Sequence, residues 1–208
     1  MPFYKDHIYP HLVDWLGNPP PIEKLRRDLI PLAEGTVLEI GVGSGPNFPY
    51  YDPARVNKLY ALEPNQGMAR RAKNRRDQTR VAIEFVDLPG ERIPLEDATV
   101  DTVVSTFTLC TIPGVLEAIQ SVGRVLKPGG KFLFLEHGVA PEPSVRRWQE
   151  ITEPFCRWAF EGCRMTRDIP SLIREGGFRI EQMNTGYVAP FPKCGSYCYW
   201  GVGAHMTM

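Results

Sequence analysis

The stretch that decides the fold is "VLEIGVGSGPN", from Val37 to Asn47. A short aliphatic run enters a turn with glycines at positions 41, 43 and 45. Similar turns follow the first strand of dinucleotide-binding folds, where a third glycine stands three positions after the second and backbone N–H groups hold a pyrophosphate. Here that place is taken by Pro46, which lacks an N–H to donate. The turn therefore predicts a ligand other than a dinucleotide.

Two acidic residues frame this turn. Glu39 stands two residues before Gly41, at the carboxyl end of the first expected strand, where ligands of open α/β sheets bind. A carboxylate there repels a pyrophosphate and attracts an ammonium group. Glu63 ends the second expected strand, where an acidic side chain can accept both hydroxyl hydrogens of a ribose. S-adenosylmethionine has the ribose, the ammonium group and a sulfonium, and it has no phosphate.

Alternating strand and helix patterns run on both sides of the turn. Alternation of this kind predicts parallel strands joined by right-handed crossovers, with helices on both faces of a doubly wound sheet. The last two strand-like runs have no helix between them, so they are expected to pair as an antiparallel hairpin. The expected strands are 37–40, 58–62, 81–85, 100–104, 131–135, 178–183 and 197–204, and the expected helices are 3–16, 22–33, 46–51, 66–76, 114–126, 145–160 and 169–175.

Composition bounds the possible partners. The chain has 208 residues, enough for a single domain, and its 24 Lys and Arg balance 24 Asp and Glu. This balance disfavours nucleic acids and anionic surfaces as partners. Charged residues interrupt the N-terminal apolar run, so no signal peptide and no stable membrane insertion are expected, and a cytoplasmic location is favoured.

Five cysteines, an odd number, favour reduced thiols over a disulfide framework. Cys194 and Cys198 invite a comparison with metal ligands. In an extended strand they would stand roughly 13 Å apart, too far for a shared ion, so no metal is expected.

Four motifs occur in one order: "LEIGVGSGPN", "ALEPNQGM", "IPLEDATVDTVVST" and "VLKPGG". In these the chain resembles the class I S-adenosylmethionine-dependent methyltransferases, from about residue 36 to the C-terminus. The resemblance implies a seven-stranded, mostly parallel α/β sheet with an antiparallel last strand, in agreement with the expected hairpin. It also implies one domain, in which 1–34 is a helical lid, 35–140 the cofactor-binding core and 141–208 the acceptor side.

The resemblance further implies which residues hold S-adenosylmethionine. Glu39 would orient the amino group of the methionine moiety, directly or through water, and Glu63 would hold the ribose. The family usually places an acid that reads the adenine where this chain has Pro89, so backbone groups are expected to replace that contact. The predicted cofactor-binding residues are Glu39, Gly41, Val42, Gly43, Ser44, Gly45, Asn47, Glu63, Pro64, Asn65, Met68, Leu88, Pro89, Gly90, Glu91, Thr106, Phe107 and Cys110.

Methyl transfer from a sulfonium is an in-line displacement, so an enzyme mainly supplies alignment and, in some cases, a base. His137, at the carboxyl end of the fifth expected strand, is the candidate base, and Glu136 either orients it or faces solvent. The alternative is a histidine that only bonds to a loop. The predicted acceptor-binding residues are Tyr4, His7, His137 and Trp148, with the N-terminal segment folding over the cofactor or simply packing on the sheet.

The motifs "LEHGVAPEPS" and "EGCRMTRD" resemble the thiol S-methyltransferase branch of this family and its bacterial relatives. They imply a small, rather apolar thiol acceptor. Cys163, within the second motif, is either a thiol of lowered pKa or a small buried residue. Methylation of a quinone, phenol or lipid precursor at O, N or C, and a regulatory module that binds the cofactor without turnover, are the alternatives. Glu39 and Pro46 disfavour an NAD-dependent oxidoreductase.

Overall fold

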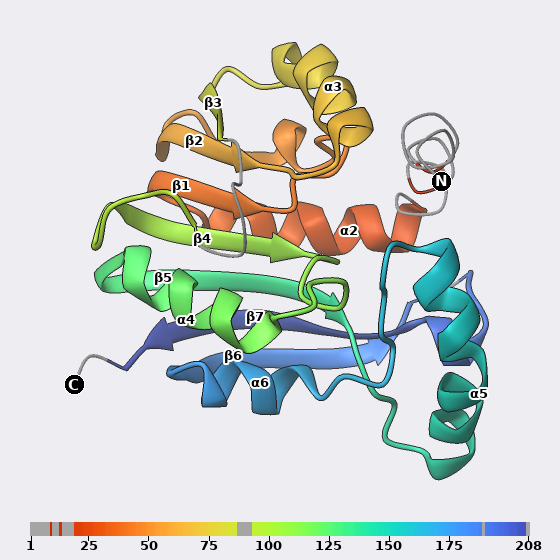
Figure 1. Ribbon diagram of the computed structural model, residues 1–208. Coiled ribbons are helices and arrows are strands. Elements are labelled where there is room, and N and C mark those ends of the chain that lie inside the picture. The colour runs from red at the N-terminus through yellow and green to blue at the C-terminus, as the bar shows by residue number, and fades with distance from the viewer. Residues whose placement is uncertain (1–8, 10–12, 14–18, 87–92, 189, 207–208) are drawn as a thin grey trace.

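The computed structural model describes Tyr9, Val13 and residues 19–86, 93–188 and 190–206. Its centre is a seven-stranded sheet in the order β3-β2-β1-β4-β5-β7-β6 (Figure 1). Only β7 runs antiparallel to its neighbours, β5 and β6, which confirms the predicted doubly wound sheet. The strands are β1 (Gly35–Ile40), β2 (Val56–Leu62), β3 (Ala82–Val86), β4 (Val100–Thr106), β5 (Leu126–His137), β6 (Phe178–Tyr187) and β7 (Tyr197–His205).

Two of the described helices, α3 and α6, begin at a residue whose side chain caps the helix. The Asn65 side chain accepts a hydrogen bond from the Met68 amide at the start of α3, and Asp168 does the same for Ser171 at the start of α6. Pro170 lies in the first turn of α6, where its missing N–H costs no helical bond. The helices are α2 (Pro20–Leu29), α3 (Gln66–Arg75), α4 (Val115–Val125), α5 (Pro143–Ala159) and α6 (Ile169–Glu175).

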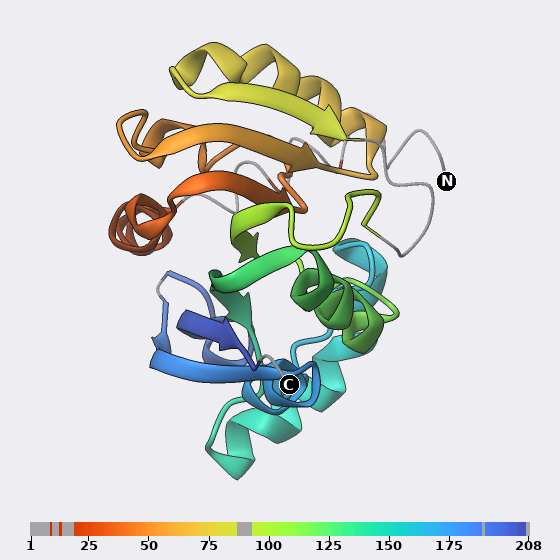
Figure 2. The same ribbon diagram turned by 90° about the vertical axis from the view of Figure 1, so that its left-hand side faces the viewer.

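Successive residues of β1 point to opposite faces of the sheet, and each face has its own apolar core. Val37 packs in one core with Ile22 and Leu29 of α2. Leu38 packs in the other with Ile119 of α4 and residues of α6. Figure 2 shows α2 and α4 on opposite sides of the sheet. Burial on both faces explains why the central strands lack polar alternation.

One predicted element is shorter than expected. The helix predicted over 46–51 is a single 3-10 turn, Phe48–Tyr50. Gly45 has φ +81°, and Pro46 and Pro49 lack the amide donors that an α-helix needs. Of the helix predicted over 3–16, only Tyr9 and Val13 are described, and both are helical. The division into 1–34, 35–140 and 141–208 stays a prediction.

The long helix α5 lies beyond the carboxyl ends of the parallel strands, at the right of Figure 1. Gln149 of α5 is 1% exposed, and its side chain joins the helix to the chain after β5 by hydrogen bonds. The Gln149 amide donates to the Gly138 carbonyl at 3.1 Å, and its oxygen accepts from the Ala140 amide at 2.9 Å. The strand ends therefore face α5 across the region where ligands of open α/β sheets bind.

Candidate functional site

A cavity of about 730 Å³ lies at the carboxyl ends of β1, β2, β4 and β5. At one end it is lined by the glycine turn and Glu63, and at the other by His137, Cys163 and aromatic residues that follow α5. The cavity thus joins the predicted cofactor region to the predicted acceptor region. Among the predicted residues, those that line it are Gly41, Val42, Gly43, Ser44, Glu63, Pro64, Met68, Thr106, Phe107, Cys110 and His137.

The turn after β1 can adopt its path only with glycine. Gly41, Gly43 and Gly45 all have positive φ, at +66°, +58° and +81°. A Cβ on Gly41 would come within 2.2 Å of the Thr108 side chain, and one on Gly45 within 2.6 Å of Phe48. Only at Gly43 would a Cβ meet ordinary contact distances, which leaves its backbone open to the cavity.

Glu63 is half-buried at the end of β2 and is held by the backbone. Its two carboxylate oxygens accept from the amides of Gly43 at 2.8 Å and Asn65 at 2.9 Å. Burial raises the pKa of this carboxyl to about 7, although both backbone donors oppose the shift. A carboxylate has about four acceptor sites, so two remain for ligand hydroxyl groups.

Glu39, in contrast, does not line the cavity. It is fully buried, and its oxygens accept from Asn47 at 2.7 Å and from the Tyr51 hydroxyl at 2.7 Å. Asn47 also lies behind the wall, with its amide shared between Glu39 and Thr106. A role for Glu39 in cofactor binding stays a prediction, and in this structure the residue acts through its hydrogen-bonded neighbours.

Sequence reasoning missed Arg26 of α2. This residue is 4% exposed, lines the cavity, and donates to Asn47 at 2.6 Å and to Thr106 at 2.9 Å. Burial lowers the pKa of its guanidinium to about 10, while nearby Glu39 favours the charged form. Its Nε is the one buried side-chain polar atom without a hydrogen-bond partner among the described residues. No local motif marks Arg26, because its partners are distant in sequence.

The end of β4 and the chain after it form the floor of the cavity, with three of the predicted cofactor-binding residues. Thr106, Phe107 and Cys110 all line it. Phe107 has φ +55°, a conformation that bulky residues rarely adopt outside functional sites, and its ring lies 4.6 Å from that of His137.

Glu136 neither orients His137 nor faces solvent, so both sequence expectations for it are wrong. It is fully buried and accepts from the Ser105 hydroxyl at 2.6 Å and from the amides of Thr108 and Cys110. Adjacent residues of a strand point to opposite faces, which separates Glu136 from the imidazole beside it in sequence. Glu136 therefore fixes the path of the floor of the cavity.

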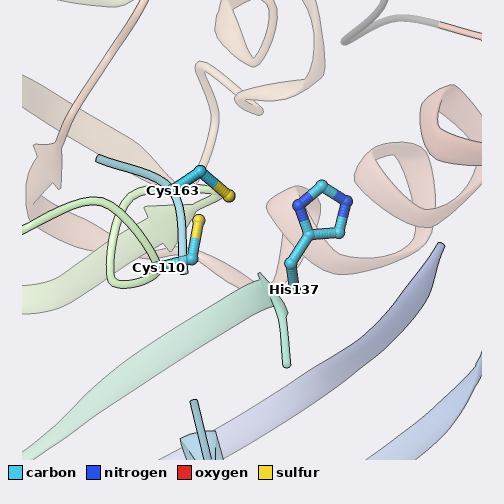
Figure 3. Close-up of side chains that lie close together, drawn as sticks. All are labelled: Cys110, His137 and Cys163. Carbon is cyan, nitrogen blue, oxygen red and sulfur yellow. The ribbon is translucent and has the colours of Figure 1, made fainter. Parts of the chain in front are cut away.

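His137 is close to two thiols. The possible ligand atoms of Cys110, His137 and Cys163 all lie within 4.8 Å of one another, and Figure 3 shows their side chains converging. A hydrogen bond from Cys110 and the nearby imidazole lower the pKa of Cys163 to about 5, against the effect of burial. Burial alone would lower the pKa of His137, but Cys198 and Cys163 raise it well above its usual value. Cys163 thus combines the two alternatives expected from the sequence: it is buried, and its pKa is lowered.

The acceptor end of the cavity comes from the later part of α5 and from the chain between α5 and β7. Phe155, Phe160, Met165 and Phe191 line this end. Trp148 does not, so its predicted place in the pocket is wrong: its side chain is 60% exposed near the start of α5. Only the later part of the helix, from Thr152, reaches the cavity.

The remaining predicted residues fall into two groups. Gly45 and Asn65 support the site from behind, since Gly45 fixes the turn and Asn65 caps α3 and donates to Glu161 at 3.2 Å. Tyr4, His7 and Leu88, Pro89, Gly90 and Glu91 lie outside the described residues. Tyr9 and Val13, which neighbour Tyr4 and His7 in sequence, do line the cavity.

Comparisons with known proteins identify a similar sequence family and similar folds. Residues 38–134 match a family model described as a methyltransferase domain. Residues 38–134 are thus similar to this methyltransferase domain family, and the seven-stranded sheet that contains them has the class I methyltransferase fold. An S-adenosylmethionine-dependent methyltransferase of Thermotoga maritima, described as a possible histamine N-methyltransferase, superposes with a TM-score of 0.62 at 21% identity, covering 96% of this chain and 99% of that one.

Two curated relatives of the methyltransferase domain carry names that specify an acceptor. The thiol S-methyltransferase TMT1B of Rattus norvegicus is 34% identical over 157 residues, which cover 72% of this chain and 62% of that protein. A ubiquinone/menaquinone biosynthesis C-methyltransferase of Bartonella tribocorum is 31% identical over 129 residues, covering 60% of this chain and 45% of that protein. The chain thus spans less than two thirds of the length of either relative.

S-adenosylmethionine is the methyl donor of this domain family, and the methyltransferase cavity fits it. Glu63 offers two unused acceptor sites to a ribose, and the Gly43 backbone is open to the ligand. Arg26 brings a buried positive charge and an unpartnered Nε to the same cavity, which suits the methionine carboxylate. In the described part of the chain, no helix combines the length and apolar character needed to cross a membrane.

Proposed function

We propose that the chain transfers the methyl group of S-adenosylmethionine to a small, rather apolar thiol. One observation carries this proposal: a single cavity runs from Glu63 and the glycine turn to an apolar wall that contains His137 and four cysteines. Both reaction partners would therefore occupy one continuous cavity. Binding in one cavity fixes the approach of the two reacting atoms.

The cofactor end would hold two polar groups of the methyl donor, the ribose and the carboxylate of its methionine moiety. Glu63 would accept the ribose hydroxyl hydrogens, and Arg26 would pair with the carboxylate of the methionine moiety. Glu39 would keep Arg26 charged and hold Asn47 in place. When bound, the donor supplies an electrophilic methyl group on a sulfonium.

The acceptor end suits a thiol for two reasons. Its wall is mainly apolar and sulfur-rich, with Phe155, Phe160, Met165 and Cys163 among the lining residues. Thiols ionise near neutral pH and are strong nucleophiles, so a thiol acceptor needs no dedicated base. The name of the Rattus norvegicus relative is consistent with this choice.

A quinone or phenol is the second candidate acceptor. Phe107, Phe160 and Phe191 would accommodate an aromatic ring, and a relative from Bartonella tribocorum is named for quinone biosynthesis. A phenol or a carbon acceptor needs a stronger base than a thiol, because its proton is held more tightly. The two candidates therefore differ in how strongly they depend on His137.

The proposed function is tested with matched acceptors. The purified chain is incubated with S-adenosylmethionine carrying a labelled methyl group and with an aryl thiol, the phenol of the same ring, or a quinol. Labelled thioether from the thiol alone supports the proposal, and labelled product from the phenol or quinol alone overturns it. The Glu63→Ala variant is the negative control in each reaction.

A binding measurement distinguishes an enzyme from a regulatory module that binds the cofactor without turnover. At about a hundred-fold excess over Kd, a ligand adds roughly 2.7 kcal/mol to the free energy of unfolding. Stabilisation by S-adenosylmethionine with no product from any acceptor would favour the module. Stabilisation by NAD alone would favour an oxidoreductase. A cytoplasmic location and the absence of nucleic-acid partners remain predictions.

A further inference from the structure

The two thiols and the imidazole that converge in the cavity come from three separate segments. Cys110 follows β4, His137 ends β5 and Cys163 follows α5. Their possible ligand atoms lie within 4.8 Å of one another, and Figure 3 shows the Cys163 sulfur pointing toward the imidazole ring and the Cys110 sulfur pointing toward Cys163. Cys110 is 1% exposed and Cys163 is 7% exposed, while His137 is half-buried. In the part of the chain that the structure describes, no other set of metal-ligating side chains converges in this way.

Backbone hydrogen bonds hold the three segments together. The Arg164 amide donates to the Cys110 carbonyl at 2.9 Å, which joins the loop of Cys163 to that of Cys110. Arg167 bridges the same loops by donating to the Leu109 and Ile112 carbonyls. The Cys110 amide donates to buried Glu136, which also belongs to the strand of His137. Small side-chain rotations on a fixed backbone would therefore suffice to close the cluster.

The chemistry of the cluster matches one class of ligand. Thiolates and imidazoles are the preferred ligands of Zn²⁺, with metal–sulfur bonds of about 2.3 Å and metal–nitrogen bonds of about 2.0–2.1 Å in tetrahedral sites. Neighbouring ligand atoms in such a tetrahedron stand roughly 3.5–3.8 Å apart, within reach of the observed spacing. Two thiolates also neutralise a divalent cation, so the bound cluster would add no net charge to the interior.

The number of ligands distinguishes a reactive site from a structural one. Structural zinc sites use four protein ligands, whereas catalytic sites use three and leave one position open. All three residues of this cluster line the cavity, so a fourth position would open toward the acceptor.

We propose that Cys110, His137 and Cys163 bind Zn²⁺, and that its open position receives the sulfur of the acceptor thiol. This inference rests on the proposed function. The thiol loses its proton to water as its sulfur binds the cation. The sulfur then forms a bond to the methyl carbon while the bond from that carbon to the sulfonium breaks, and the neutral thioether dissociates.

The first experiment measures the cation directly. Reduced full-length protein is stripped with a chelator, titrated with Zn²⁺ against a chromophoric chelator, and titrated separately with Co²⁺. One equivalent of Zn²⁺, with the sulfur-to-cobalt charge-transfer absorption of a tetrahedral thiolate site, is expected. Cys110→Ser, His137→Asn and Cys163→Ser should each lower Zn²⁺ affinity by about 100-fold or more, because each removes a direct ligand. The control is Cys194→Ser, which changes a cavity cysteine outside the cluster and should leave the Zn²⁺ stoichiometry unchanged.

A second measurement needs no variant and so does not depend on the folding of one. Zn²⁺ should protect Cys110 and Cys163 of the unaltered protein from an alkylating reagent, as read by mass spectrometry, and should leave Cys194 unprotected. No Zn²⁺ bound by the reduced protein, or equal protection of all three cysteines, would overturn the proposal. A disulfide between Cys110 and Cys163 as the sole response to these conditions would overturn it as well.

The role in catalysis is separated from binding by comparing stripped and reloaded protein. Zn²⁺ should raise kcat/KM for the aryl thiol at least about tenfold and should leave S-adenosylmethionine affinity unchanged. Full thiol methylation by stripped protein would overturn the activating role and leave the proposed function standing. Stoichiometric Zn²⁺ with no methylation of any thiol would contradict the proposed function itself.

Discussion

The two ends of the cavity are built in different ways. At the cofactor end, the glycine turn and Glu63 follow the consecutive parallel strands β1 and β2, and backbone amides hold the carboxylate in place. At the acceptor end, Cys110, His137 and Cys163 come from three distant segments. The first end is polar and locally encoded, while the second is largely apolar and assembled by the fold. This difference separates binding of the methyl donor from choice of the acceptor.

Replacing Arg26 tests whether the cofactor end depends on its buried charge. Arg26→Met should lower the free energy of unfolding by about 3–5 kcal/mol, because it removes the cation that offsets Glu39 and leaves the Asn47 side-chain oxygen without its donor. Chemical denaturation measures this loss. Exposed Arg27 of the same helix supplies the control, Arg27→Met, which should change stability little.

A double variant sharpens this test. Adding Glu39→Gln to Arg26→Met should restore part of the stability, since it removes the uncompensated carboxylate. If the double variant lost as much unfolding free energy as the two single variants together, Arg26 and Glu39 would not be coupled.

Replacing Glu63 should damage the cofactor end alone. Glu63→Ala removes a carboxylate that would accept two ribose hydrogens, and S-adenosylmethionine affinity should fall roughly 100-fold or more. Isothermal calorimetry measures this change. Glu84→Ala, on the exposed surface of β3, is the matched control. Unchanged affinity in Glu63→Ala would contradict the ribose assignment.

The raised pKa of Glu63 predicts a pH dependence of binding. Ribose hydroxyls donate to the ionised carboxylate, so binding should release a proton and strengthen as pH rises through about 7. Affinity should increase about tenfold between about pH 6 and about pH 8, and Glu63→Gln should remove this slope. Calorimetry in two buffers of different ionisation enthalpy would detect the released proton.

The same group affects folding in the opposite direction. A carboxyl whose pKa rises from 4.5 to about 7 on folding keeps a proton that the unfolded chain releases. Without ligand, its contribution to stability is therefore present below about pH 4.5 and lost as pH rises through about 7. A Glu63→Gln variant with the same pH–stability curve as the parent protein would contradict the buried-carboxyl assignment.

The smallest expected effect concerns the acceptor end. Phe155→Ala should raise KM for an apolar thiol about fivefold, because Phe155 lines the cavity but keeps much of its side chain exposed. S-adenosylmethionine affinity should not change. Trp148→Ala, on the same helix but outside the cavity, is the matched control. Equal effects of the two variants would show that exposure on α5, rather than the cavity wall, governs acceptor binding.

Much of the fold follows from local sequence patterns. The alternation of strands and helices, the hairpin without a crossover helix and the glycine turn after β1 are all visible in the sequence, because strand period, capping residues and turn residues act over short distances. The position of Glu63 follows as well, since the carboxyl ends of parallel strands meet at one edge of the sheet.

Only the tertiary structure decided which side chains face the cavity. Glu39 and Glu136 stand at strand ends just as Glu63 does, yet both are buried behind the wall by partners from other segments. Arg26 and Cys163 reach the cavity from distant helices and loops, and Trp148 is turned away from it. Local patterns fix the path of the backbone, but the contacts that select one side chain over its neighbour form only when remote segments pack together.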